Sequence, residues 1–238
     1  MKIWVYTICW QEAYMMPFFL RHYSTFADKI IVYDEQSTDG TRELVKACPV
    51  AELRDWPHKG LNDDLFIDAI HKTYPEARGK ADWVMWPDVD ELLHSHDMRA
   101  TLNTRESILG SIGFALISAK PPVVDDGKSQ LYQLCRTGVR QENYDKWIVW
   151  RPGADIRFTV GRHYLGHSNV PLRWQPFKLL HAHFINGYAL SQARNARNLE
   201  RSTMVGLGKY GWSYQQGATG PSSNGWLAHA CTRLTHVV

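Results

Sequence analysis

The feature that most restricts the fold of this chain is the alternation of strand-like and helix-like segments over residues 1–90. Four short segments rich in apolar and β-branched residues predict strands, at 2–8, 29–34, 51–56 and 81–86. The segments between them carry helical spacing or helix-start signals, at 17–27, 37–48 and 62–74. Strands and helices that alternate at such short spacings indicate a parallel α/β sheet, which is the predicted fold class.

Four loops follow the carboxyl ends of the predicted strands, and that edge is where open α/β sheets bind ligands. These loops comprise residues 7–12, 34–39, 57–62 and 87–91. Three of them contain acidic residues, and the remaining loop contains Lys59 and Asn62. We therefore expect the functional site at this edge of the sheet.

The last of these loops lies in the segment WVMWPDVDELLH, residues 83–94, where three carboxylates fall within four positions. Carboxylates this close repel one another, so a cation is expected between them. Pro87 favours an extended backbone. In that geometry Asp88 and Asp90 point the same way, while Glu91 faces away and holds the loop. Two co-directed carboxylates suit Mg²⁺ or Mn²⁺. The alternative, capping of a following helix, accounts for one carboxylate but hardly for all three.

Charge is divided unevenly along the 238 residues, although the formal net charge is only +3. Residues 1–127 contain 13 Lys and Arg against 20 Asp and Glu, whereas residues 128–210 contain 13 against 4. The acidic part suits cations and the basic part suits anions, but scattered surface charge is an equally good interpretation. We predict an α/β half at 1–110, a second half at 111–207 and a loop-like tail at 208–238.

The second half has a looser pattern than the first. Its strand-like segments are GFALISAK, QLYQLC, KWIVWRP and DIRFTV, followed by a strand at 178–185 and a basic helix at 190–207. No apolar run approaches the ~20 residues of a membrane span. The N-terminal MKIWVYTICWQE is expected to form a strand rather than a signal peptide. Four widely spaced cysteines without a CxxC pair argue against a zinc ribbon and a disulfide scaffold, so a cytoplasmic protein is expected.

Three motifs in residues 1–95 resemble those of GT-A-type nucleotide-sugar glycosyltransferases, close to the large family 2 and its short bacterial and phage relatives. In order, they are CWQEAYMMPFFLRHY, DKIIVYDEQSTDGT and WVMWPDVDELLH. They match the family's Asn-Glu-x-x-x-x-x-Pro segment, its Ser-x-Asp-Gly-Thr turn and its Asp-x-Asp-Glu element, with Gln11 in place of the usual Asn. Two later stretches, KWIVWRPGADIRFTVGRHY and KLLHAHF, match more loosely.

This resemblance implies a Rossmann-like GT-A fold, with a mostly parallel sheet flanked by helices and a C-terminal acceptor part. It also implies transfer of a sugar from a nucleotide-diphosphate donor to a hydroxyl group. Five residues are assigned to the nucleotide: Thr7, Glu12, Asp34, Asn62 and Asp88. Asp34 would hydrogen-bond the base, which favours uracil and hence a UDP-sugar. Ordinary loop and capping chemistry explains Thr7 and Glu12 equally well, and Asp39 is assigned to helix capping.

The metal ligands that the resemblance implies are Asp88, Asp90 and His183. Asp90 would bind the metal that bridges the diphosphate, and Asp88 would contact either the ribose or the metal. Enzymes of this type often add a C-terminal histidine, and His183 occupies the matching histidine–aromatic position, although a structural role is about equally expected. His181 lies two residues earlier on the same predicted strand and shares its face. Mn²⁺ or Mg²⁺ is the expected cofactor, and an imidazole ligand favours Mn²⁺.

A sugar transfer that inverts the anomeric carbon needs a carboxylate base for the acceptor hydroxyl. The family often places that base far downstream, yet residues 156–199 contain no Asp or Glu. Asp155 is a weaker candidate than four other carboxylates, which are Asp125, Asp126, Glu142 and Asp145. The sequence leaves open a displaced base or a retaining mechanism that needs none.

Other functions remain open at this stage. A sugar-phosphate nucleotidyltransferase needs a Gly-rich basic first loop, which TICWQEAY does not provide. A non-catalytic nucleotide-binding module does not explain buried carboxylates, which are costly without a cation. A metal-dependent phosphohydrolase needs ligands for a second metal, which are not evident. As acceptor we favour a glycan over a modified nucleic acid, which the basic second half and ten tryptophans permit. The sequence predicts no oligomeric state.

Overall fold

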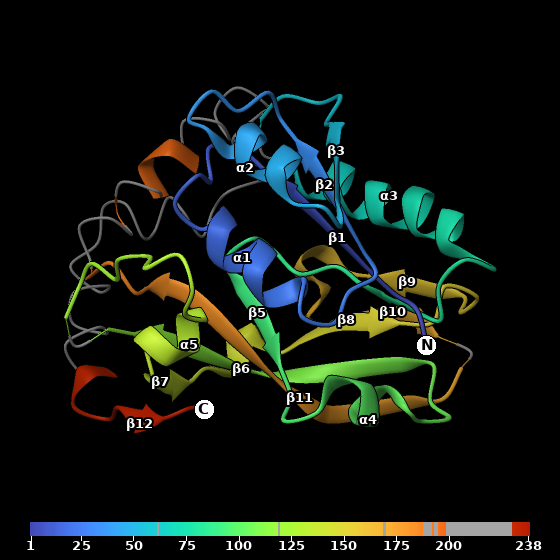
Figure 1. The fold of residues 1–238 in the computed structure, drawn as a ribbon. Coiled ribbons are helices and arrows are strands. Elements are labelled where there is room, and N and C mark those ends of the chain that lie inside the picture. Colours follow the sequence, from blue (N-terminus) through green and yellow to red (C-terminus); the bar gives the residue numbers. More distant parts are fainter. Residues whose placement is uncertain (61, 119, 169, 188–191, 193–194, 199–229) are drawn as a thin grey trace.

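The computed structural model describes residues 1–238 apart from 61, 119, 169, 188–191, 193–194 and 199–229. In this part the chain forms a mixed α/β fold around one large curled sheet (Figure 1), so the predicted fold class is confirmed. The strands are β1 (Ile3–Cys9), β2 (Lys29–Asp34), β3 (Ala51–Asp55), β4 (Trp83–Met85), β5 (Glu91–His94), β6 (Ile108–Ile117), β7 (Thr137–Arg140), β8 (Lys146–Trp150), β9 (Ile156–Phe158), β10 (Leu165–Ser168), β11 (Leu172–Phe184) and β12 (Thr235–His236). The helices are α1 (Met16–Tyr23), α2 (Thr41–Ala47), α3 (Asp63–Thr73), α4 (Met98–Leu102) and α5 (Leu131–Leu134), with 3₁₀ turns at η1 (Tyr74–Ala77), η2 (Glu142–Tyr144) and η3 (Val160–Arg162).

The main path of the sheet runs in the order β12-β7-β6-β8-β4-β1-β2-β3. β1 to β4 pair in parallel, whereas β8 joins β4 antiparallel and leads into β6 and β7. β11 runs parallel to β6 and antiparallel to β5. Because β2 and β4 lie on opposite sides of β1, the chain leaves β1 and β4 in opposite directions. That reversal opens a crevice at the carboxyl ends of the two strands.

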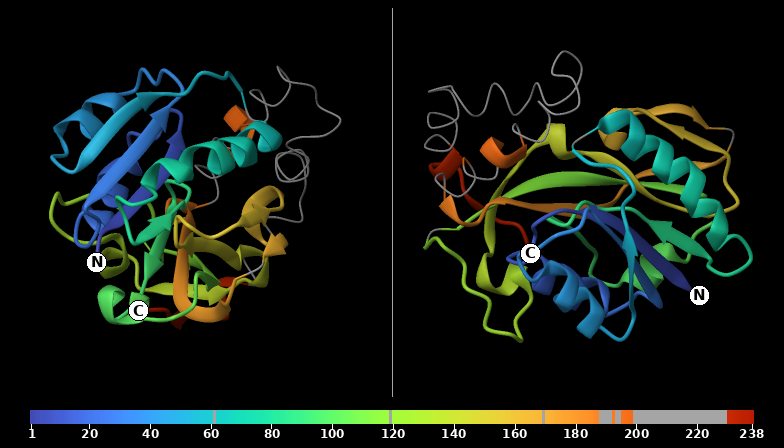
Figure 2. Two further views of the ribbon diagram at one scale, coloured as in Figure 1. Left: turned by 90° about the vertical axis from the view of Figure 1, so that its right-hand side faces the viewer. Right: turned by 90° about the horizontal axis from the view of Figure 1, so that it is seen from above.

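Helices cover both faces of the parallel strands, and the alternation of β1 decides which face each residue serves. Ile3 and Val5 pack in the core that includes α1 and α2. Tyr6 faces the other way, into an aromatic core with Ile70 of α3 and Trp86. All five side chains are fully buried. α3 therefore lies across the sheet from α1 and α2 (Figure 2).

Several elements begin or end where short sequence patterns predicted. β2 has the predicted bounds, and Asn62 caps α3 as predicted, because its Oδ1 accepts a hydrogen bond of 3.1 Å from the Leu65 N–H. α2 begins later than predicted, at Thr41, because Gly40 occupies the N-cap with φ +100°. Asp39 still contacts that first turn, since its Oδ1 accepts from the Thr41 N–H at 3.1 Å.

One prediction for the second half needs correction. QLYQLC forms α5 instead of a strand, and the Gln130 N–H donates to Gln133 Oε1 at 2.8 Å across this turn. The described end of the predicted tail contributes β12, which pairs with β7, and the loop-like character of the tail stays a prediction. Most of the predicted helix at 190–207 lies outside the described residues. In the part that the structure describes, no helix has the length and apolar character to cross a bilayer.

Candidate functional site

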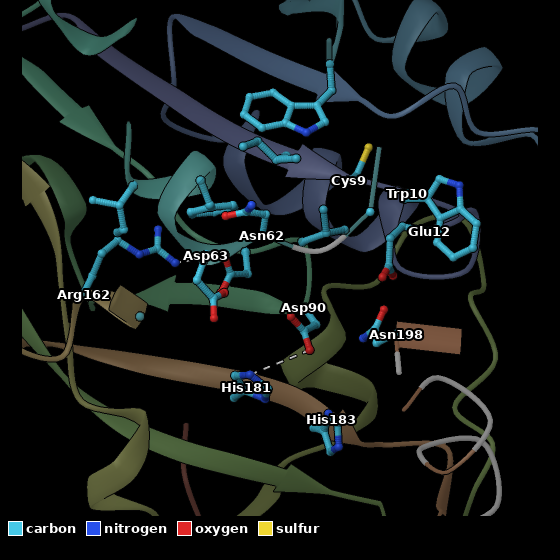
Figure 3. A pocket seen from close by; sticks show the side chains of 18 of the residues that line it. Cys9, Trp10, Glu12, Asn62, Asp63, Asp90, Arg162, His181, His183 and Asn198 are labelled. Carbon is cyan, nitrogen blue, oxygen red and sulfur yellow. Dashed lines mark hydrogen bonds and ion pairs between the residues drawn. The ribbon is translucent and has the colours of Figure 1, made fainter. Parts of the chain in front are cut away.

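A cavity of about 450 Å³ lies at the carboxyl ends of β1 and β4, in the crevice that the topology creates (Figure 3). A cavity of this size is typical of small-molecule and cofactor sites. The end of β1, the start of α3, the turn after β4, η2, η3 and β11 all contribute to its walls. The polar and aromatic lining residues include Trp10, Glu12, Trp56, Asn62, Asp63, Phe66, Asp88, Asp90, Tyr144, Arg162, His181 and His183.

Residues Asp88 to Glu91 form a turn rather than the extended segment predicted from Pro87. The Glu91 N–H donates to the Asp88 carbonyl oxygen at 2.9 Å, and the Asp88 N–H donates to Glu91 Oε2 at 3.0 Å. Glu91 therefore holds the loop, as expected. The turn places the carboxylates of Asp88 and Asp90 beside different protein groups. The expectation that the two carboxylates share a cation stays a prediction.

Asp90, His181 and His183 form the first group of partners, the Asp–His–His cluster. Each offers one ligand atom, and these atoms lie within 4.8 Å of one another. His181 Nε2 is 3.7 Å from Asp90 Oδ2, and both histidines lie beside the Asp90 carboxylate (Figure 3). The pairing of β5 with β11 brings the group together: Glu91 lies opposite His181, and the Ala182 N–H donates to the Asp90 carbonyl oxygen at 2.8 Å.

The donor set of the Asp–His–His cluster fits a divalent cation. One carboxylate oxygen with two imidazole nitrogens suits Mn²⁺ better than Mg²⁺, which prefers oxygen ligands. Asp90 is only 4% exposed, and a buried carboxylate is stabilised by a nearby positive charge. The structure thus offers a metal position made of Asp90 and two histidines, one of which, His181, the sequence did not assign.

Asp88 belongs to a second group with Glu91, Lys146 and Arg162, which we call the ion-pair cluster. Lys146 Nζ lies 2.9 Å from Asp88 Oδ2 and 2.5 Å from Glu91 Oε1. Arg162 Nη2 lies 2.8 Å from Asp88 Oδ1, and the same guanidinium donates to the Trp86 carbonyl oxygen. Both carboxylate oxygens of Asp88 are therefore paired with cations of the protein itself.

The ion-pair cluster favours the charged forms of Asp88 and Lys146. Burial acts to raise the pKa of Asp88, but the charges of Arg162 and Lys146 outweigh it and hold the pKa well below its usual range. Burial acts to lower the pKa of Lys146, and there the charges of Asp88 and Glu91 prevail and raise it. Asp88 keeps 35% of its side chain exposed, so it also presents a fixed acceptor to the cavity. Its predicted role as a metal ligand stays a prediction.

The Ser-x-Asp-Gly-Thr turn fixes the loop that follows β1. The backbone N–H groups of residues 11–13 donate in order to Ser37 Oγ, Thr41 Oγ1 and Asp39 Oδ2, at 2.8, 2.9 and 3.0 Å. These three donors are used within the protein, so this loop is not an open cradle for phosphate groups. Asp39 thus anchors the first loop in addition to its contact with α2.

The residues assigned to the nucleotide fall into two sets. Glu12 and Asn62 line the cavity, together with Asp88. Thr7 and Asp34 are fully buried and are not among the described lining residues. Thr7 lies inside β1, and Asp34 pairs with the guanidinium of Arg42 at 2.8 Å and accepts a second bond from the backbone. Nucleotide binding by these residues stays a prediction.

None of the four base candidates is among the described residues that line the cavity. Asp125 and Asp145 are each paired with an arginine, and Asp126 and Glu142 are exposed elsewhere. Asp63, at the first turn of α3, does line the cavity. Burial raises its pKa, and repulsion from neighbouring carboxylates raises it further.

Sequence reasoning assigned no role in the site to four residues that complete it: Asp63, Tyr144, Lys146 and Arg162. The spacing of the two histidines was the one local signal for His181. Gly161, with φ +73°, indicates a turn before Arg162 but not the target of its side chain. The others come from distant segments that only the folded sheet brings together.

No family model matches the chain, and no curated protein matches it either. Among solved structures, the chain is similar to mannosyl-3-phosphoglycerate synthase from Rubrobacter xylanophilus, at 12% identity over 86% of this chain and 76% of that one, with a TM-score of 0.42. It is also similar to glucosyl-3-phosphoglycerate synthase from Mycobacterium tuberculosis, solved with Mn²⁺, UDP and glucosyl-3-phosphoglycerate, at 17% identity over 48% and 44%, with a TM-score of 0.34. A third is a galactosyltransferase in complex with donor and acceptor sugar analogues, at 12% identity over 46% of both chains, with a TM-score of 0.31. The chain spans less than half the length of the last two. The chemistry proposed below rests on the residues of the cavity.

Proposed function

We propose that the chain is a metal-dependent glycosyltransferase that moves a sugar from a nucleotide-diphosphate donor to a hydroxyl acceptor. The observation that carries this proposal is the Asp–His–His cluster on the wall of a cavity at the carboxyl ends of β1 and β4. A divalent cation held there, Mn²⁺ rather than Mg²⁺, would supply the positive charge that stabilises a departing diphosphate.

Each group of residues has a separate task in this proposal. Asp90, His181 and His183 hold the cation. Asp88, fixed by the ion-pair cluster and partly open to the cavity, accepts hydrogen bonds from the hydroxyl groups of the donor. Glu12 also lines the cavity, on the side away from Arg162 (Figure 3), where it offers a further acceptor to the donor.

The nucleobase is the least determined part of the donor. Trp56 and Phe66 give the cavity apolar walls near Asn62, where a base can pack. The preference for uracil depended on Asp34, whose carboxylate is buried and bonded within the protein. The choice among UDP, GDP and ADP is therefore an outcome of the experiment below.

For the acceptor, we place the reacting hydroxyl beside Asp63. This carboxyl group lines the cavity, and its raised pKa makes it a stronger base than an ordinary aspartate. A glycan acceptor remains favoured over a modified nucleic acid. Binding of a nucleic acid would weaken steeply as salt is added, whereas binding of a neutral glycan would scarcely change.

A sugar-phosphate nucleotidyltransferase is the alternative function. Such an enzyme binds a nucleoside triphosphate, for which free backbone N–H groups in the first loop are the usual cradle. Here the N–H groups of residues 11–13 already donate to side chains of the 37–41 turn. That arrangement favours the glycosyltransferase.

The test is the thermal midpoint of the protein with Mn²⁺ plus UDP, GDP or ADP, on the wild type and on Asp90→Ala. A ligand that binds only the folded state at 100 times its Kd stabilises it by about 2.7 kcal/mol, which corresponds to roughly 5–10 °C for a chain of this size. We expect such a rise for one diphosphate, dependent on Mn²⁺ and absent in Asp90→Ala.

Asp68→Ala is the matched control, because Asp68 is 60% exposed on α3 and pairs only with an exposed lysine in the described residues. The control should keep the full rise. Absence of a rise with all three diphosphates in the wild type would contradict the proposal. If one diphosphate binds, release of that diphosphate from its common sugar conjugates then identifies the donor.

A further inference from the structure

No described residue gives His181 the hydrogen bond that normally orients a metal-binding histidine. In metal sites the second ring nitrogen usually donates to a carboxylate, a carbonyl oxygen or water, and this bond fixes the ring. His181 turns Nε2 toward Asp90, at 3.7 Å, so Nδ1 is the nitrogen directed away from the cluster. Nδ1 is buried, and it has no hydrogen-bond partner among the described residues. Some other contact must hold the ring.

The ring of Tyr144 supplies that contact. It is stacked on the imidazole of His181, with ring centroids 4.2 Å apart and an angle of 19° between the planes. A flat aromatic face against a flat imidazole favours one orientation of the histidine ring and resists its rotation. Tyr144 belongs to η2 and His181 to β11, so the contact joins two segments that are distant in the sequence.

The backbone around Tyr144 is fixed by Gly113 of β6. A Cβ atom on Gly113 would lie 2.3 Å from Tyr144 Cβ and 2.5 Å from its carbonyl carbon, so only glycine permits this approach. The Gly113 N–H donates to Asp145 Oδ1 at 2.7 Å, and Arg140 holds Asp145 Oδ2 at 2.6 Å. The Gln141 N–H donates to the Gly113 carbonyl oxygen at 3.0 Å. The turn that carries Tyr144 is therefore anchored at both ends.

We propose that Tyr144 is a positioning residue for the metal site: its ring, held in place across Gly113, fixes the imidazole of His181 for cation binding. The inference rests on the proposed function, because it assumes that the Asp–His–His cluster holds a cation. It also gives a task to Asp145, a base candidate from the sequence, whose carboxylate anchors the Tyr144 turn instead of acting on the acceptor.

Tyr144 also lines the cavity, so a competing role is to stack on the ligand itself. The two roles differ in the absence of nucleotide. A residue that positions His181 affects the binding of Mn²⁺ alone, whereas a platform for a base or a sugar affects only the binding of the nucleotide.

The test is the Kd of Mn²⁺ with no nucleotide present, measured from the electron paramagnetic resonance signal of free Mn²⁺. Loss of a group that orients a metal ligand typically weakens metal binding 10–100-fold. We expect Tyr144→Leu, which lacks a flat ring, to weaken Mn²⁺ binding by about 10-fold. Tyr144→Phe keeps the ring, so its Kd for Mn²⁺ should stay within about twofold of the wild-type value, well below the ~10-fold change expected for Tyr144→Leu. Urea unfolding of the metal-free variants checks that each is folded, and Tyr144→Met replaces Tyr144→Leu if the latter is not.

A double-mutant cycle with His181→Ala decides whether the effect passes through His181. If it does, Tyr144→Leu weakens binding in the wild type but has less than about a twofold effect when His181 is already absent. An equal weakening in both backgrounds, or none in the wild type, overturns the inference while leaving the metal site intact. A wild-type protein that binds no Mn²⁺ overturns the inference and the proposed function together.

Discussion

Lys146→Met tests the buried ion-pair cluster behind the cavity. The lysine side chain is 8% exposed, its partner Glu91 is fully buried, and Arg162 is 1% exposed. Removal of one partner from a buried pair costs about 3–5 kcal/mol, because the remaining charge is left without compensation. Asp88 is 35% exposed, so water screens part of the negative charge that it is left with when Lys146 is removed. We therefore expect a loss near the lower end, about 3 kcal/mol of unfolding free energy.

Urea unfolding followed by tryptophan fluorescence measures this loss. Lys72→Met is the matched control: Lys72 pairs with Asp68 at 3.2 Å, but the two side chains are 77% and 60% exposed. An exposed pair at this spacing contributes about 0.3–0.5 kcal/mol. A loss below about 1 kcal/mol in Lys146→Met, comparable to the control, would refute the claim that Lys146 compensates buried carboxylates. Glu91→Gln added to Lys146→Met should restore part of the stability, since it removes a buried carboxylate whose remaining arginine contact, Arg162 Nη2, is 4.0 Å away.

The same variant changes the dependence of stability on pH. The pKa of Asp88 is lower in the folded protein than in the unfolded chain, so the unfolded chain takes up its proton first as the pH falls. The contribution of Asp88 is therefore complete above about pH 4 and is lost as the pH falls further. Without Lys146 the folded pKa rises toward the unfolded value, so the loss still begins at about pH 4 but should be smaller and complete at a higher pH. An unchanged acid limb in Lys146→Met would contradict the assigned pairing.

Three further predictions concern single side chains. Burial lowers the pKa of His22 to about 4, so its contribution to stability is complete above about pH 6.5 and is lost as the pH falls toward 4; ¹⁵N NMR should show a neutral ring at pH 5.5. Tyr23→Phe removes a buried hydroxyl that donates to the Glu91 carbonyl oxygen at 2.9 Å and accepts from the Leu93 N–H at 3.0 Å, and urea unfolding should show a loss of about 1–3 kcal/mol. Asp63→Asn should lower the transfer rate by about 10²–10⁴ while the diphosphate-induced midpoint rise persists; an unchanged rate would exclude Asp63 as the base.

The elements that could be predicted from sequence are those whose signals lie within a few residues. β2 is a continuous apolar run, and Asn62 caps α3 with its own side chain, so both were placed well. α5 escaped prediction because its single turn, Leu131–Leu134, is too short for a helical pattern to stand out in the sequence. The Gln130 N–H stabilises this turn by donating to Gln133 Oε1 at 2.8 Å.

The site was predicted only in outline, because its parts come from distant strands. The sheet edge was predicted from local patterns, and Asp90 and His183 were predicted as metal ligands from the family resemblance. Lys146 of β8 and Arg162 of η3 have no local signal that points to Asp88, since their proximity depends on the pairing of β8 with β4 and β6. The sequence alone does not show that Lys146 and Arg162 neutralise Asp88. It therefore indicates a metal between Asp88 and Asp90 more strongly than the folded protein does.

The register between β5 and β11 decides which side chains meet Asp90. In the observed register His181 lies opposite Glu91, and His181 and His183 share the face beside the turn, while Ala182 points into the core at 4% exposure. A slip of one residue would reverse the two faces, directing both histidines into the core and an alanine toward the carboxylate. Phe177, only 2% exposed, and Lys178, whose Nζ donates to the Val237 carbonyl oxygen at 2.8 Å, oppose that slip, because it would bury the lysine in place of the phenylalanine. Core packing several residues away therefore specifies the metal site, which explains why the local Asp-x-Asp-Glu pattern alone could not assign its ligands.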